Sequence, residues 1–139
     1  MSIREELIDT LAGLALFADL SRPQLEGVAH TFEEEYFADG QRVLRQGFSG
    51  SNLYVIVSGQ AGVHVDGTQR AVLSRGDFFG EISVLLGEPP AADVVAVGPL
   101  RCLALPGPDV ESFLLTFPRV SYRMLQAEAR RVRTANLWR

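Results

Sequence analysis

Short β-prone runs separated by turn residues fill the middle of the chain, and they constrain its fold more than any other feature. The clearest runs are 31–37, 41–45, 52–57, 62–65, 70–73, 92–97 and 100–105. Between two of them, Asp66-Gly67 predicts a two-residue type I′ hairpin turn, because that turn needs positive φ at both central residues. About eight short strands at this spacing are typical of an all-β barrel or jelly roll, in which closure or sheet stacking removes exposed strand edges.

The first thirty residues predict two helices. Leucines recur at helical spacing within residues 3–16, at Leu7, Leu11 and Leu14. Ser21 is the expected N-cap of a second helix, which tolerates Pro23 in its first turn and runs to about residue 30. We therefore expect a short helical unit before the β region.

The last thirty residues predict two more helices. Pro108 opens one, Pro118 ends it, and a final helix runs from about Arg119. Residues at alternating spacings of three and four follow one face of this final helix: Tyr122, Leu125, Ala129, Val132 and Asn136. That pattern is typical of a short coiled-coil seam. The seam either pairs with a second copy of the chain or packs on the β region, and we favour a homodimer through this C-terminal helix.

The pattern as a whole predicts one domain that is mainly β with flanking helices. We expect N-terminal helices in residues 1–30, an eight-stranded β-roll of the jelly-roll type in 31–107, and two C-terminal helices in 108–139. A length of 139 residues suits one domain, and the sequence contains no internal repeat or linker.

Composition excludes several classes of partner. The net charge of −4 gives the whole chain no broad attraction to DNA or acidic lipid, so we expect neither nucleic acid nor a membrane as a partner. The polar start is unlike a signal peptide, and no apolar stretch reaches the length of a membrane span. Cys102 is the only cysteine, which fits a reducing environment and predicts a cytoplasmic location.

Catalytic arrangements are absent from the sequence pattern. His30 and His64 are the only histidines, and they fall on different predicted elements without the spacing of metal ligands. No Ser/His/Asp or Cys/His arrangement is discernible. We therefore predict that the chain is not an enzyme, holds no metal and carries no resident cofactor.

One segment, residues 76–94, carries candidate binding chemistry. Gly80-Glu81 leaves a predicted strand, and the residues from Ile82 to Leu86 can form one helical turn. Free backbone N–H groups at the start of such a helical turn form a binding site for an anion or a sugar-phosphate, since Gly80 lets a ligand approach closely. A carboxylate at this place would repel phosphate unless it accepts a hydrogen bond from a hydroxyl such as that of ribose.

This segment resembles the phosphate-binding cassette of the cyclic-nucleotide-binding domain family, which occurs in catabolite-activator-type regulators, kinase regulatory subunits and gated channels. The family pattern reads approximately F-G-E-[LI]-[AS]-L and, a few residues later, P-R-A-A-[TS]. The matching residues are Phe79, Gly80, Glu81, Ile82, Ser83, Val84, Pro89, Ala91 and Ala92. The resemblance covers nearly the whole chain and implies the β-roll fold, with a nucleotide pocket between the roll and the final helix.

The resemblance also implies roles for individual residues. Glu81 would hold the ribose 2′-hydroxyl. The backbone N–H groups that would face the cyclic phosphate are those of Gly80, Ile82, Ser83, Ala91 and Ala92. Two positions depart from the family pattern: Pro90 stands where the family has its phosphate-binding Arg, and Asp93 where it has Ser or Thr.

These departures weaken the expected binding of cAMP and cGMP. Losing a buried Arg–phosphate contact costs about 2–5 kcal/mol, which corresponds to roughly 30- to 5,000-fold in affinity. Pro90 has no N–H of its own, and Asp93 would repel an anion if its side chain pointed into the pocket. A different arginine could take the missing place, and the candidates near the cassette are Arg45, Arg75 and Arg101.

Three residues each have two interpretations. Glu81 is either a ribose ligand or a carboxylate that only caps backbone N–H groups. Ser83 either contacts a ligand or makes hydrogen bonds at the start of the short helix. Trp138 is either an aromatic lid over the base or part of a frayed chain end.

The sequence therefore predicts a non-catalytic sensor or regulatory module. Its candidate ligands are cAMP, cGMP or another nucleotide or nucleoside. One alternative is a ligand-independent dimerisation or docking unit with a degenerate pocket. Another is the sensor part of a transcription regulator that lacks its DNA-binding segment.

Overall fold

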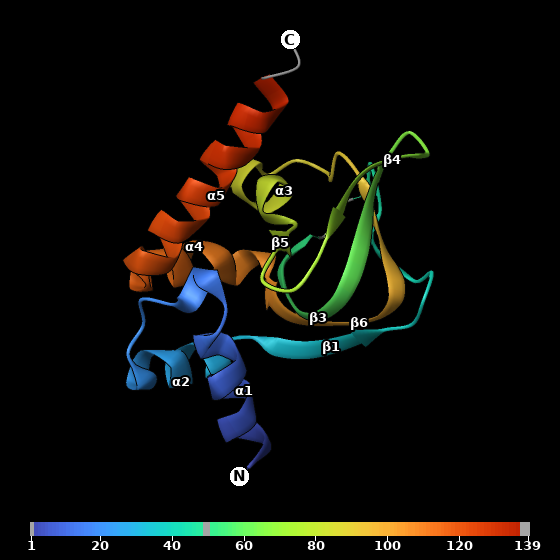
Figure 1. Ribbon diagram of the computed structural model, residues 1–139. Coiled ribbons are helices and arrows are strands. Elements are labelled where there is room, and N and C mark those ends of the chain that lie inside the picture. The colour runs from blue at the N-terminus through green and yellow to red at the C-terminus, as the bar shows by residue number, and fades with distance from the viewer. Residues whose placement is uncertain (1, 49–50, 137–139) are drawn as a thin grey trace.

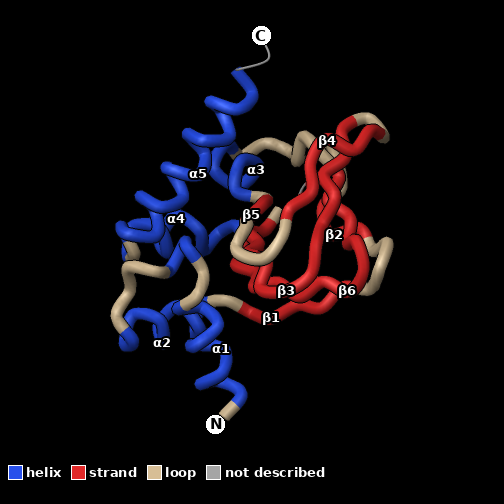
Figure 2. The backbone as a smooth tube through the Cα atoms, viewed as in Figure 1, coloured by secondary structure: helices blue, strands red, loops and turns tan. Residues whose placement is uncertain are grey.

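Helices from both ends of the chain gather on one side of a β-roll (Figures 1 and 2). The computed structural model describes residues 2–48 and 51–136. Its helices are α1 (Ile3–Ala12), the 3₁₀ turn η1 (Ala15–Phe17), α2 (Arg22–Thr31), α3 (Glu81–Leu86), α4 (Gly107–Thr116) and α5 (Pro118–Asn136). Its strands are β1 (Glu33–Phe37), β2 (Arg42–Leu44), β3 (Asn52–Val65), β4 (Thr68–Leu73), β5 (Phe78–Phe79) and β6 (Asp93–Pro106).

Of the two N-terminal helices, α2 begins where its capping residue predicts, and α1 is shorter than expected. Ser21 caps α2 with a reciprocal pair of bonds, because its hydroxyl accepts from the N–H of Gln24 while the Gln24 side chain accepts from the N–H of Ser21. The helix expected over residues 3–16 is shorter. It ends at Ala12, with Gly13 as its C-cap, and a separate 3₁₀ turn begins at Ala15.

The fold class predicted from the sequence is confirmed, with fewer and longer strands. All pairings are antiparallel in the order β1-β6-β3-β4, with β2 also paired to β6 and β5 to β3. The described residues form six strands. β3 and β6 each join two of the predicted runs into one strand of 14 residues, and the short β5 lies outside the predicted runs. Shifts in the β3–β6 register lie between the joined runs, where each strand bends around the roll.

The predicted hairpin turn is confirmed at the β3–β4 connection. Asp66 has φ 51° and Gly67 has φ 80°, as a type I′ turn requires. The side chain of Gln46 holds this turn from a distant loop, because its amide donates to the Asp66 carboxylate and accepts from the Asp66 N–H.

Two cores lie on opposite faces of the central strands. Along β3, Leu53, Val55 and Val57 pack among the helices, while Tyr54 and Ile56 point into the interior of the roll. This alternation follows from the two-residue period of a strand, and it explains why the run is apolar at every position.

β6 repeats the pattern, and its buried Cys102 faces the interior of the roll. Burial raises the pKa of the Cys102 thiol to about 12.

Helix α5 packs on the helical core through one face only. Val120 and Met124 are buried there, and Ala127 packs against the same cluster. The apolar seam residues lie on another face, where Tyr122, Leu125 and Val132 are 50%, 66% and 58% exposed. The seam therefore does not pack on the β-roll. No helix in the described ranges combines the length and hydropathy that crossing a bilayer requires.

Candidate ligand-binding site

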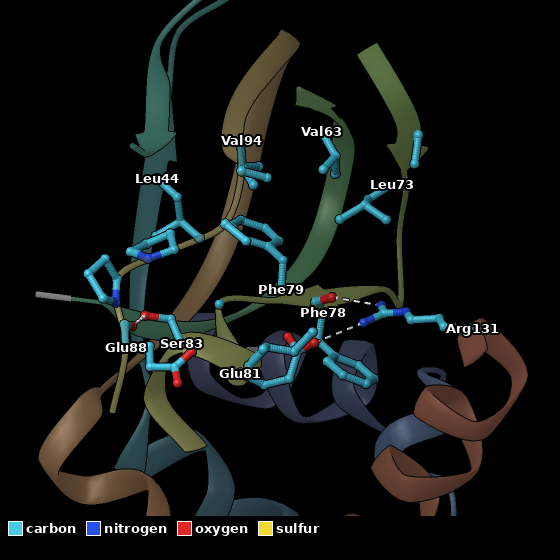
Figure 3. A pocket seen from close by; sticks show the side chains of 17 residues that line it. Leu44, Val63, Leu73, Phe78, Phe79, Glu81, Ser83, Glu88, Val94 and Arg131 are labelled. Carbon is cyan, nitrogen blue, oxygen red and sulfur yellow. Dashed lines mark hydrogen bonds and ion pairs between the residues drawn. The ribbon is translucent and has the colours of Figure 1, made fainter. Parts of the chain in front are cut away.

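A cavity of about 410 Å³ opens between the β-roll, α3 and the later turns of α5. That volume lies within the range of small-molecule sites. In Figure 3 the apolar side chains of Leu44, Val63, Leu73 and Val94 extend from the strands on one side. The polar side chains that line it are on the other side: Glu81, Ser83, Glu88 and Arg131. The cavity is thus apolar at one end and polar at the other.

Gly80 sets the backbone path at the polar end. Its φ is 86°, and a Cβ at this position would lie 2.1 Å from the carbonyl oxygen of Asn52. Only glycine meets both demands, so the strand can turn directly into α3. This turn puts Glu81 in the first position of α3, at the wall of the cavity.

Glu81 is a buried carboxylate with one satisfied oxygen. The residue is 3% exposed, and Oε1 accepts a hydrogen bond from Arg131 Nη1 at 3.1 Å. Within the described part of the chain, Oε2 is buried and has no hydrogen-bond partner. Burial and the neighbouring Glu128 raise the pKa of the Glu81 carboxyl, while Arg131 lowers it, and together they bring this pKa to about 7.

Arg131 ties the final helix to the cassette. Besides the bond to Glu81, its guanidinium donates to Glu128 Oε1 and to the carbonyl oxygen of Phe78, both at 2.8 Å. It also lies 4.4 Å from the centre of the Phe78 ring, within cation–π range. One side chain of α5 thus bonds the strand and the helix on either side of Gly80.

Sequence reasoning missed Arg131 as a pocket residue, although the helical spacing of apolar residues in α5 could have indicated it. Val120, Met124 and Ala127 follow the 3.6-residue period of the buried face of α5, and position 131 is the next on that face. The candidates proposed from the sequence do not line the cavity as far as the described residues go. Arg101 pairs with Glu34 at 2.8 Å, and the Arg45 guanidinium lies 6.0 Å from the Phe48 ring.

The two departures from the cassette pattern lie in different environments. Pro90 is buried at the cavity wall, and its carbonyl oxygen accepts from the N–H of Gly47 at 2.9 Å. Asp93 is not among the lining residues. Its Oδ1 accepts from the N–H of Gln46 at 2.7 Å, and its Oδ2 lies 3.8 Å from Arg42 Nε. The Asp93 carboxylate therefore does not point into the pocket, and the repulsion considered from the sequence does not arise.

The other cassette residues come together as the sequence suggests. Gly80, Ile82, Ser83, Ala91 and Ala92 all line the cavity beside Glu81. The Ser83 hydroxyl is engaged locally, since it lies 2.8 Å from Ser51 Oγ and donates to the carbonyl oxygen of Glu88.

Two further expectations concern the lid and metal binding. Trp138 lies outside the described residues. Among residues 2–48 and 51–136, no group of three or more His, Cys, Asp or Glu could hold a metal ion.

The fold and the cavity define a β-roll domain with a cavity of small-molecule size, and comparison with known proteins gives the family. Residues 34–117 match the family model for the cyclic nucleotide-binding domain. The chain therefore belongs to the cyclic-nucleotide-binding domain family.

Relatives and solved structures agree with this assignment. The chain is 40% identical, over 68% of its length, to a cAMP-dependent protein kinase regulatory subunit from Mucor circinelloides f. lusitanicus. It is 30% identical to the Thermus thermophilus catabolite activator protein, with a TM-score of 0.78 over 88% of this chain and 60% of that one. It is 31% identical to the N-terminal domain of a transcriptional regulator from Streptomyces coelicolor A3(2), with a TM-score of 0.69 over 92% and 93% of the two chains. The chain spans 12% to 23% of the length of three curated relatives that it matches.

Proposed function

We propose that this chain is a single-domain, non-catalytic sensor whose pocket disfavours the family's usual recognition of cAMP and cGMP. One observation carries the proposal: the cavity has Pro90 at its wall where the family pattern has the phosphate-binding Arg. Arg131 is the only cation among the described lining residues, and it is already bonded to Glu81 and Glu128.

The proposed output runs through α5. Arg131 belongs to this helix and contacts the cassette directly, so a ligand beside Glu81 would favour one packing of α5 over another. A ligand changes such an equilibrium only by its difference in affinity for the two packings. The relatives are named as a kinase regulatory subunit, a catabolite activator protein and a transcriptional regulator, and we propose that this domain controls a partner in the same general way.

Calorimetric titration with cAMP and cGMP tests the proposal. The natural chain is expected to bind neither nucleotide at micromolar concentrations. The Pro90→Arg variant restores the missing cation and is expected to bind cAMP roughly 30- to 5,000-fold more tightly than the natural chain. Pro99→Arg, at an exposed position on β6, makes the same substitution away from the cavity and should change nothing. Micromolar or tighter binding of either nucleotide by the natural chain contradicts the proposal.

A second candidate function is ligand-independent dimerisation or docking. The exposed apolar seam of α5, formed by Tyr122, Leu125 and Val132, favours it. The same face would serve a homodimeric sensor, so the two functions differ in whether the pocket takes a ligand. We retain the predictions of a cytoplasmic location and of no membrane or nucleic-acid partner for this chain.

A further inference from the structure

We propose that this cavity binds an uncharged, mainly apolar molecule against the inner wall of the β-roll, through the side chains of the strands. The inference rests on the proposed sensor function and deepens it by naming the chemical class of the ligand. Three features of the described residues carry it: a continuous apolar row across four strands, polar side chains that already have partners, and a buried proline in place of a cation.

The inner wall of the roll is a continuous row of apolar side chains. Leu44 of β2 is paired with Val94 of β6, and Val94 is in turn paired with Val63 of β3. Val63 is paired with Ala71 of β4. All four residues line the cavity, and Leu73 extends the row along β4 (Figure 3). Side chains at paired positions point to the same face of a sheet, so the row forms one surface. A polar ligand covering that surface would leave its own polar groups unpaired.

The volume of the cavity sets the size of the ligand. An apolar cavity of about 150 Å³ holds one benzene ring. This cavity measures about 410 Å³, so it has room for about two fused rings. Phe78 and Phe79 belong to the same lining, and an aromatic ligand can pack against them.

The polar side chains at the other end of the cavity are already engaged within the described chain. Arg131 makes three hydrogen bonds, to two carboxylates and one carbonyl oxygen. The Ser83 hydroxyl is bonded to Ser51 and to the carbonyl oxygen of Glu88. Glu81 uses Oε1 for Arg131, and its Oε2 is buried out of reach of a ligand. A charged or hydroxyl-rich ligand would have to break existing bonds, whereas an apolar molecule needs none of these groups.

Pro90 puts hydrocarbon where the family pattern has a cation. The residue is buried and lines the cavity beside Pro89, and its carbonyl oxygen is occupied by the N–H of Gly47. Glu88 also lines the cavity but is exposed, so water can solvate its carboxylate. An ionised ligand would lose its own hydration and meet no unengaged cation among the described lining residues. An uncharged ligand avoids this cost.

Phe78 connects such a ligand to the final helix. This residue lines the cavity, and the Arg131 guanidinium of α5 lies 4.4 Å from the centre of its ring. A ligand packed on Phe78 would therefore act on one of the contacts through which the proposed output runs.

Calorimetry on the full chain with a matched pair of probes tests the ligand class. 2-Naphthol is uncharged at neutral pH, and 2-naphthyl phosphate carries the same rings with an anionic group. The natural chain is expected to bind 2-naphthol with a dissociation constant of about 0.1 mM or lower. It should bind the phosphate at least about tenfold more weakly. Equal affinity for the two probes overturns the inference, and so does a failure to bind 2-naphthol.

Two neighbouring residues of β4 provide a matched pair of variants. Leu73→Asp places a carboxylate in the apolar wall and should weaken 2-naphthol binding at least about tenfold. Val72 is 47% exposed and is not among the described lining residues, so Val72→Asp should leave binding unchanged. If Leu73→Asp does not fold, Ala71→Phe narrows the cavity from the same strand and should weaken binding, with Val72→Phe as its control. Equal binding by a wall variant and its control contradicts the proposed location.

Pro90→Arg distinguishes failure of this inference from failure of the proposed function. If that variant binds cAMP while the natural chain does not bind 2-naphthol, the pocket works as a sensor and the apolar-ligand inference is wrong. If the natural chain itself binds cAMP at micromolar concentrations, the proposed function fails and the inference falls with it.

Discussion

Arg131 Nη1 on the C-terminal helix lies 3.1 Å from Glu81 Oε1 in the cassette, joining residues 50 positions apart in the sequence. Glu81 is also the carboxylate that the family resemblance assigns to ribose. The same side chain therefore belongs both to the candidate binding site and to the contact that holds α5. The contact thus joins the wall of the cavity to the final helix without any intermediate residue.

Removing the Arg131 side chain should loosen the end of α5 and destabilise the fold. Arg131→Ala loses charged hydrogen bonds to Glu81 and Glu128 and leaves Glu81 buried without a cation, so we expect a loss of about 1–3 kcal/mol in the free energy of unfolding. Urea denaturation measures this loss, and hydrogen exchange should be faster around residues 128–136. Arg133→Ala, at an exposed position two residues on, is the matched control. Equal stability of the two variants would mean that the Arg131 contacts contribute nothing.

Stability should fall as the pH rises from about 4.5 to about 7. The folded state keeps the Glu81 proton up to a pKa of about 7, whereas the unfolded state loses it near 4.5, so over this window the folded state binds more protons. Glu81 alone would then remove at most about 3 kcal/mol across that window. Above pH 7 this contribution levels off.

Urea denaturation at a series of pH values checks this dependence. Glu81→Gln keeps the size of the side chain and removes its titration, so the variant should lose the downward slope between pH 4.5 and 7. Curves that run parallel for the two proteins would exclude Glu81 as the titrating group.

Local rules account for much of the fold. The capping box at Ser21, the Asp66-Gly67 turn and the helix boundaries near Pro108 and Pro118 depend on residues a few positions apart, and each could be read directly. The joining of two predicted runs into the single strand β3 could not be predicted from neighbouring residues. Turn residues such as Ser58-Gly59 indicate a break, but pairing with β6 on both sides keeps the strand continuous through a bend.

The candidate site likewise contains residues that the sequence could identify and residues that only the folded structure places there. The cassette residues Gly80 to Ser83 lie together because they are consecutive, and the family resemblance identified them. Arg131 reaches the cavity only because α5 packs against η1 and α4, which depends on contacts between segments far apart in the sequence. The direction of Asp93 likewise depends on Gln46 and Arg42, which lie far away in the sequence.

Gly80 should be the glycine least tolerant of substitution near the site. In Gly80→Ala, the new Cβ would lie 2.1 Å from the Asn52 carbonyl oxygen at φ 86°. Gly40→Ala is a close control, since its φ is 80° and a Cβ there meets nothing within 4 Å. We expect Gly40→Ala to cost about 1 kcal/mol for the positive φ. Gly80→Ala should cost at least about 2 kcal/mol more, because the backbone itself must move. Thermal or urea unfolding compares the two, and equal losses would show that the close approach to Asn52 is not limiting.

The exposed seam of α5 predicts self-association. Leu125 and Val132 are 66% and 58% exposed on a face that carries the seam spacing, and burying both against a second copy would remove apolar surface from water. The chain is expected to sediment as a dimer at tens of micromolar, and Leu125→Glu should shift it to monomer by placing a charge in the seam. Leu115→Glu, at a 76% exposed position on α4, makes the same change off the seam and should leave the dimer intact. A natural chain that remains monomeric at those concentrations would remove the main support for a dimerisation module.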